Sequence, residues 1–199
     1  YNNSFFDENI NSKMDLELIL QPSRFSIFKW INNSILIDST YNAAPWSMKV
    51  VINNVLNLQK SLYKDFELVL VLWEMRELWD YSESEHKNLA NIVNPLTKNI
   101  FILWEDMKKY FSKELEVLGN NNYKFFKNSY ELWLSLKDFV SNSDKKYLIL
   151  FKWSQNTIFL EEAVKLLQFS ISDNLKVCRQ QDFWLDNKGK FFWQNLKNR

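Results

Sequence analysis

The stretch Phe66-Glu-Leu-Val-Leu-Val-Leu72 decides the fold of this chain. It is an almost unbroken apolar run of strand length, which is typical of a β-strand buried on both faces of a sheet. Three further apolar runs have the same character and lie at residues 34–38, 99–103 and 147–151. Between and after them, apolar residues recur at three- and four-residue steps, which predicts helices over 45–63, 82–93, 105–118, 129–140 and 157–169.

Strands that alternate with helices at this spacing predict an α/β fold, with a mainly parallel, doubly wound, Rossmann-like sheet and helices on both faces. Each strand-to-helix junction then lies at the carboxyl edge of the sheet, where ligands bind in such folds. The sequence therefore directs attention to four junctions, at 38–45, 72–82, 103–106 and 151–157.

Local signals predict several element ends. Pro45 suits a first helical turn, Gly119 suits the position just after a helix, and Ser82 with Glu85 matches a capping box. Residues 186–189 form a turn signal between two aromatic segments, which predicts a terminal hairpin, with a short helix as the alternative.

Composition excludes several classes of protein. The chain has 199 residues with 25 Lys+Arg and 24 Asp+Glu, and this balance does not fit a strongly basic nucleic-acid binder. A single cysteine, Cys178, excludes a disulfide framework, and one Cys with one His leaves too few ligands for a zinc site. We expect Cys178 to be a buried apolar side chain. No apolar run reaches the roughly 18 residues that a membrane span needs.

Four motifs, which follow one another in a fixed order along the chain, narrow the possible families. They are Pro22-Ser-Arg-Phe25, Asp38-Ser-Thr-Tyr-Asn-Ala-Ala-Pro-Trp-Ser-Met48, Trp73-Glu-Met-Arg-Glu-Leu-Trp79 followed by His86, and Lys152-Trp-Ser154. Together they resemble the C-terminal domain of the Mur ligases, the ATP-dependent enzymes that build the peptidoglycan stem peptide. The family patterns are P-G-R-[FM], D-D-x-Y-N-A-N-P-x-S-M, G-[DE]-M-x-E-L-G with S-x-x-x-H, and K-G-S. The resemblance covers about residues 20–170.

The resemblance implies a domain organisation. Residues 22–178 would be the Mur ligase C-terminal domain, 1–21 the tail of a missing central ATPase domain, and 179–199 a C-terminal extension. The chain has no G-x-x-x-x-G-K-[ST] phosphate-binding loop, so ATP and Mg²⁺ would be held mainly by that central domain. We therefore expect the chain to need the N-terminal and central domains of the same ligase and to be inactive alone. The family is cytoplasmic.

Within the family, the Y-N-A-x-P and E-M-x-E-L strings favour the members that add D-Ala-D-Ala to UDP-MurNAc-tripeptide through an acyl phosphate. Two alternatives stay open. One is another amide ligase of the Mur or folylpolyglutamate type. The other is a degenerate, non-catalytic binding domain, because Ser39 and Ala44 replace an aspartate and an asparagine of the family pattern.

The resemblance also implies site residues, although it assigns no catalytic residue and no metal ligand in this chain. Arg24 matches an arginine that reaches the nucleotide, and a guanidinium suits phosphate. Asp38 lies in the motif that places an aspartate near the ATP ribose, one position before the usual one. Tyr41 and Asn42 match residues on the nucleotide side.

Other motif residues would face the incoming substrate. Lys152 and Ser154 match K-G-S, and Glu74 and Glu77 are candidates for domain closure or for the amine side. His86 matches the family histidine but lies inside a predicted helix, so we expect it to have a structural role.

The tryptophan and glycine counts are unusual. The chain has two Gly and nine Trp, whereas ordinary usage of ~7% would give roughly 14 glycines. Several tryptophans lie at strand exits and tight turns, where glycine is favoured. These are Trp30, Trp46, Trp73, Trp79, Trp104 and Trp153. One hypothesis is that the source organism reads UGA as glycine and that the translation assigned it to tryptophan.

Overall fold

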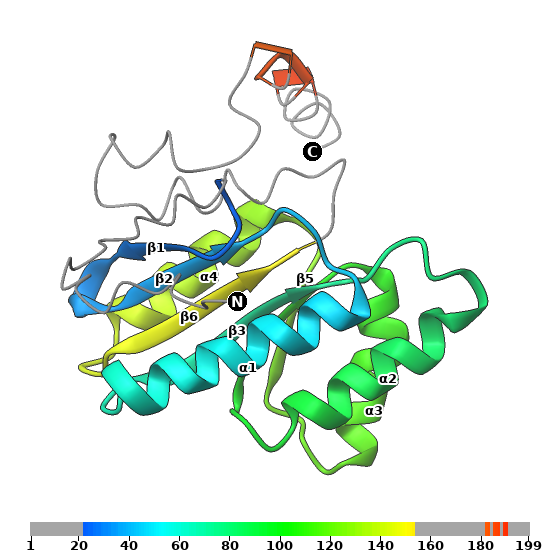
Figure 1. Cartoon of the computed structure of the whole chain (residues 1–199), viewed down its shortest axis with the longest axis horizontal. Helices are drawn as coiled ribbons and strands as arrows, with labels where there is room; N and C mark the ends of the chain where they lie inside the picture. The colour runs from blue at the N-terminus through cyan, green and yellow to red at the C-terminus, as the bar shows by residue number, and fades with distance from the viewer. Residues whose placement is uncertain (1–21, 154–181, 184, 188, 191–199) are drawn as a thin grey trace, which may run out of the picture.

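The computed structural model describes residues 22–153, 182–183, 185–187 and 189–190. Their core is a six-stranded sheet with the strand order β1-β2-β6-β3-β4-β5 (Figure 1). All neighbouring pairs are parallel except β1 with β2. The strands are β1 (Ser26–Lys29), β2 (Ile35–Ser39), β3 (Glu67–Trp73), β4 (Asn99–Leu103), β5 (Tyr123–Phe126) and β6 (Tyr147–Lys152).

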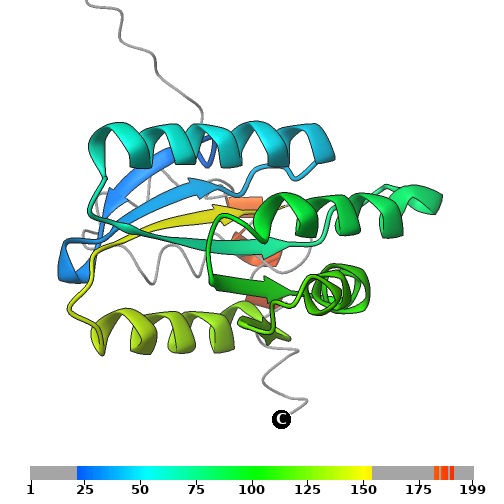
Figure 2. The same cartoon turned by 90° about the horizontal axis from the view of Figure 1, so that it is seen from below.

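Helices cover both faces of this sheet, as Figure 2 shows edge-on. One face carries α1 (Pro45–Leu62), α2 (Ser82–Val93), the π-helical segment η3 (Met107–Phe111) and α3 (Ser112–Val117), and the other carries α4 (Ser129–Ser141). Two short 3-10 turns, η1 (Ile31–Asn33) and η2 (Trp79–Tyr81), complete the described elements. Among the described helices, none has the length and apolar character to cross a membrane.

The alternation of side chains along β3 divides the core into two layers. Leu68, Leu70 and Leu72 pack under α1, α2 and α3, whereas Val69 and Val71 pack against α4. The register extends this pattern across the sheet, because Leu70 is level with Leu150 of β6 and Ile100 of β4. Burial on both faces explains why the strand sequences are continuous apolar runs.

The structure confirms the α/β class and the parallel sheet, with the four predicted strands inside it. It adds β1 and β5, which the sequence did not predict. Both lie at the sheet edges, and their burial alternates or is partial, so neither forms a long apolar run. The helix predicted over 157–169, like Cys178, lies outside the described residues.

Two predicted helix ends are confirmed and one is wrong. Pro45 is the first residue of α1, and Gly119 has a φ of 76° after the end of α3. Ser82 is not an N-cap, because α2 begins after Tyr81 and the Ser82 hydroxyl donates instead to Asp106 Oδ2 at 2.6 Å. A tertiary partner has replaced the local one.

The terminal hairpin predicted around residues 186–189 is also wrong. The described residues 182–183, 185–187 and 189–190 are helical, which supports the alternative of a short helix. A turn signal between two aromatic segments does not distinguish these structures, because Asn and Asp occur at helix ends as well as in hairpin turns.

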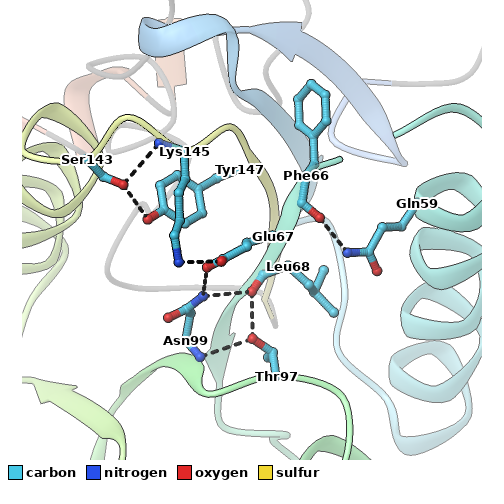
Figure 3. Close-up of polar contacts among 9 residues, drawn as sticks. All are labelled: Gln59, Phe66, Glu67, Leu68, Thr97, Asn99, Ser143, Lys145 and Tyr147. Atoms are coloured by element: carbon cyan, nitrogen blue, oxygen red, sulfur yellow. Dashed lines mark hydrogen bonds and ion pairs between the residues drawn. The ribbon is translucent and has the colours of Figure 1, made fainter. Parts of the chain in front are cut away.

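A polar network holds the amino-terminal edge of the sheet (Figure 3). Thr97 Oγ1 and Asn99 Nδ2 both donate to the Leu68 carbonyl, at 2.6 Å and 3.3 Å. Lys145 pairs with Glu67 at 2.5 Å across the β3–β6 boundary. Because these groups satisfy each other, they stabilise this edge of the sheet.

The two-layer core gives a matched test on α4. Leu136 is fully buried, whereas Leu134 in the same helix is 41% exposed. Leu136→Ala should lower the free energy of unfolding by about 2–5 kcal/mol through lost burial and a cavity. Leu134→Ala should change it by about 0.5 kcal/mol or less. Chemical denaturation measures both, and equal losses would contradict the placement of α4.

Candidate functional site

A hollow of about 380 Å³ lies at the carboxyl edge of the sheet, where β2 and β6 end beside α1. Its walls come from the turn before β1, the loop from β2 to α1, the first turns of α1 and the end of β6. The lining residues are Ser23, Arg24, Phe25, Ser39, Tyr41, Asn42, Ser47, Val51, Asn54 and Lys152.

Parallel pairing brings the carboxyl ends of β2 and β6 together beside this hollow. Ser39 and Lys152 are register partners at the ends of β2 and β6, although they are 113 positions apart in the chain. The turn at residues 22–25 folds back on the same edge. There the Tyr41 amide donates to the Ser23 carbonyl at 3.2 Å, and the Ser23 hydroxyl donates to Asp38 Oδ2 at 2.7 Å.

Asp38 stabilises the two segments that line the hollow, the turn at Ser23 and the loop after β2. It is fully buried, and its other carboxylate oxygen accepts a hydrogen bond from the Thr40 amide at 3.0 Å. Asp38 is not among the lining residues of the hollow. Its carboxylate therefore ties the loop after β2 to the turn at Ser23, whereas Ser39 at the next position faces the opening.

Arg24 is one of the residues that line the hollow. Its guanidinium carbon is 4.2 Å from the centre of the Tyr41 ring, in a cation–π contact that orients the planar group. The side chain stays exposed, so its donors can reach a ligand.

Lys152 provides a second cation from the wall. The residue is 3% exposed, and its ammonium group donates to the carbonyls of Asn42 and Ser39. Burial lowers the pKa of Lys152 to about 8, with Arg24 adding to the effect and Asp38 opposing it. A lysine in this state gains most from an anionic partner, because a negative charge favours its protonated form.

The charged side chains that line the hollow are therefore all cationic. Arg24 and Lys152 both line it, and none of the described lining residues is acidic. Tyr41 offers an aromatic face next to these cations, and Asn42 and Asn54 offer amides. This combination suits a ligand that carries phosphates on a polar, ring-bearing body.

The second junction forms a separate polar group. Glu74 follows β3, is 7% exposed, and accepts from Arg76 Nε at 3.2 Å. Burial raises the pKa of Glu74, which Arg76 opposes. Glu77 is exposed with a φ of 62°. Neither glutamate lines the hollow beside Lys152, and Ser154 lies outside the described residues.

His86 fixes the loop that carries Glu74. The imidazole is fully buried, its Nε2 accepts the Met75 amide at 2.9 Å, and its Nδ1 donates to the Ser82 carbonyl at 2.7 Å. Both ring nitrogens are thus occupied by backbone, which supports a structural role. Asp106 completes the group through its bond to Ser82, and no sequence motif drew attention to it.

Comparison with known proteins shows the family to which the chain belongs. No protein-family model matches the chain. The UDP-N-acetylmuramoyl-tripeptide–D-alanyl-D-alanine ligase of Bacillus subtilis is 31% identical over 153 residues, which are 76% of this chain and 30% of that protein. Sequence and fold together place the chain with the C-terminal domains of the Mur ligases. It spans about a third or less of the length of the relatives it matches.

Two solved structures show the shared Mur ligase fold. A crystal structure of MurF from Acinetobacter baumannii is similar with a TM-score of 0.59 and 24% identity, covering 73% of this chain and 30% of that one. The MurF ligase of Thermotoga maritima, solved in complex with ADP, gives a TM-score of 0.55 at 20% identity. The similar region covers 81% of this chain and 33% of the T. maritima chain.

The burial of His86 in this Mur ligase domain predicts a pH effect. Burial lowers the pKa of His86. The unfolded chain then binds more protons than the folded one below the ordinary histidine pKa, so the free energy of unfolding should fall as the pH drops from 7 to 5. His86→Gln should reduce this loss, as denaturation at both pH values will measure. The chain has one histidine, so identical pH profiles would contradict the assignment.

Proposed function

We propose that this chain is the C-terminal domain of an ATP-dependent ligase that adds D-Ala-D-Ala to UDP-MurNAc-tripeptide in peptidoglycan precursor synthesis. The similarity to the B. subtilis enzyme supports the substrate class. The observation that carries the proposal is the hollow in which Arg24, Tyr41, Asn42 and Lys152 meet at the carboxyl edge of the sheet.

The hollow would take part of the nucleotide. Arg24 would place two parallel donors on phosphate oxygens, and Lys152 would add a point charge from the wall. The face of the Tyr41 ring orients the guanidinium, and Asn42 would contact the polar body of the nucleotide. Asp38 positions this loop through Ser23 and Thr40 instead of meeting the ribose directly.

The reaction needs such charges. A carboxylate is a poor electrophile, so the γ-phosphoryl group of ATP would pass to the tripeptide carboxylate, giving an acyl phosphate and ADP. The amine of D-Ala-D-Ala would then attack the carbonyl carbon and release phosphate. Cations around the transferred group lower the barrier by offsetting the developing negative charge.

The incoming substrate would meet the second junction as the domains close. The motif assigned Lys152 to the substrate side together with Ser154, but Lys152 lies with Arg24 in the hollow, so we assign it to the nucleotide and leave Ser154 for the substrate. Glu74 and Glu77 would provide carboxylates for the amine or for the closed interface. An ion pair with Arg76 positions Glu74, and His86 binds the backbone of the next residue, Met75. Burial raises the pKa of Glu74, so an ammonium group would be a favourable partner for its charged form.

The rest of the ligase would supply the phosphate-binding loop and the Mg²⁺ site. Among the described residues, no cluster of three or more His, Cys, Asp or Glu could hold a metal ion. We propose that residues 1–21 lead from a central ATPase domain, that 22–178 form this domain, and that 179–199 extend it. The chain alone would not turn over, and the whole enzyme would work in the cytoplasm on its UDP-linked substrate.

Two variants test the nucleotide contacts in a ligase that joins this chain to N-terminal and central Mur domains. Arg24→Ala and Lys152→Met should each weaken ADP binding about 10-fold to 100-fold, since a charge-assisted hydrogen bond contributes about 1.5–3 kcal/mol. Lys60→Met, at the exposed end of α1, is the matched control and should bind ADP normally. Calorimetric titration with ADP measures all three.

The alternative is a degenerate domain that only binds a partner, and Ala44 in place of the second motif asparagine favours it. If the joined ligase folds but forms no product from ATP, D-Ala-D-Ala and the tripeptide substrate, this alternative replaces the proposal. Product with a different amino acid would instead indicate another Mur or folylpolyglutamate-type ligase.

The lowered pKa of Lys152 predicts a pH dependence. Below about pH 8 the ammonium form dominates, and above it the charge is lost. ADP should therefore bind more tightly at pH 7 than at pH 9, and Lys152→Met should show a smaller difference between the two. Equal pH dependence in both proteins would mean that another group is responsible.

A further inference from the structure

Indole rings crowd the carboxyl ends of three adjacent strands. Trp73 ends β3, Trp153 follows β6 and Trp104 follows β4. The ring centroids of Trp73 and Trp153 are 3.3 Å apart with their planes tilted by 49°. Aromatic pairs in proteins normally lie about 4.5–7 Å apart. Tilted rings at the shorter distance overlap, so this edge has too little room for both indoles.

The indole N–H of Trp73 also lacks a partner in the described part of the chain. Trp73 is 1% exposed, and its Nε1 has no hydrogen-bond partner among the described residues. Buried indole N–H groups usually find an acceptor, because an unpaired donor loses its bond to water without replacement. Trp104 also stacks on Trp73, with the ring centroids 5.1 Å apart.

Backbone conformation singles out two tryptophans. Trp79 has a φ of 49° and Trp104 has a φ of 81°, in the left-handed region that glycine enters freely and bulky residues rarely adopt. Phe25 shows a φ of 71°, so conformation alone does not decide the identity of a residue here. The 87% exposure of Trp79 adds an independent reason at that position, since its indole gains little from packing. Trp104 is partly buried against the core, so its case rests on its backbone conformation and on its stacking against the crowded Trp73.

The backbone and ring contacts of other tryptophans fit tryptophan. Trp133 lies in the middle of α4, where glycine would be unfavourable, and its ring contacts Tyr130 at 5.5 Å and the ammonium of Lys137 at 5.5 Å. Its Nε1, like that of Trp73, has no hydrogen-bond partner among the described residues, so this feature does not separate the two, and the ring overlap and the backbone do. Trp30 has an extended backbone with a φ of −140°, and Trp46 lies in the first turn of α1. The geometry therefore favours glycine at some of the tryptophan positions and tryptophan at others.

We propose that Trp73, Trp79, Trp104 and Trp153 are encoded by UGA codons that the source organism translates as glycine, whereas Trp133 is a true tryptophan encoded by UGG. A chain with two glycines and nine tryptophans is the composition that such a reassignment leaves in a conventional translation. In the native protein, the ends of β3, β4 and β6 are then bare main chain, which lets a substrate approach the backbone closely.

The gene and the native protein test this directly, without any assumption about activity. The nucleotide sequence should show UGA at codons 73, 79, 104 and 153 and UGG at codon 133. Mass spectrometry of peptides from the protein purified from its source should show glycine at the four positions and tryptophan at 133. A UGG codon, or tryptophan in the peptide, at any of the four positions would overturn the proposal.

Recoded proteins give a second measurement with a matched pair. Starting from the printed 199-residue sequence, Trp104→Gly should raise the folded-to-unfolded ratio about tenfold by removing an unfavourable backbone conformation. Trp133→Gly should lower it by at least as much. If the printed sequence does not fold and the fourfold glycine variant does, the result is equally supportive. A loss of stability in Trp104→Gly would contradict the proposal.

Discussion

Parallel pairing of β2, β6, β3 and β4 is the constraint on which this structure depends. Hydrogen bonding in register sends the carboxyl ends of all four strands to the same edge, so that residues far apart in the chain become neighbours. Ser39 and Lys152 meet for this reason alone. The opposite edge is closed by polar side chains that satisfy one another, as in the group around Glu67 and Leu68.

Polar groups buried at the carboxyl edge are each held by a different partner, and this decides what they can do. Lys152 is bonded to two carbonyls and has a lowered pKa, which prepares it for an anion. Glu74 has a raised pKa beside Arg76. His86 has both nitrogens engaged by backbone, which leaves it no free position for acid–base chemistry. The hollow thus gathers the cations Arg24 and Lys152, whereas the second junction holds a buried carboxylate beside Arg76.

Much of the site could be predicted from sequence, because motif residues keep their order along a fold that collects strand ends. Arg24, Tyr41, Asn42 and Lys152 line one hollow, although the motif had assigned Lys152 to the substrate side, and their roles stay predictions. Asp38 was harder to interpret, since a carboxylate in a motif does not reveal whether it faces a ligand or supports a loop. Asp106 lies in the junction predicted at 103–106 but was given no role, because its partner Ser82 is 24 positions away and has the pattern of a local helix cap.

The sequence by itself determined the α/β class, the four central strands and the helix boundaries at Pro45 and Gly119, because burial on two faces and backbone conformation leave local signatures. Only the tertiary structure decided the edge strands β1 and β5, the role of Ser82 and the crowding of Trp73 against Trp153. These depend on contacts between distant segments. The pattern of one segment carries no information about which partner occupies the space beside it.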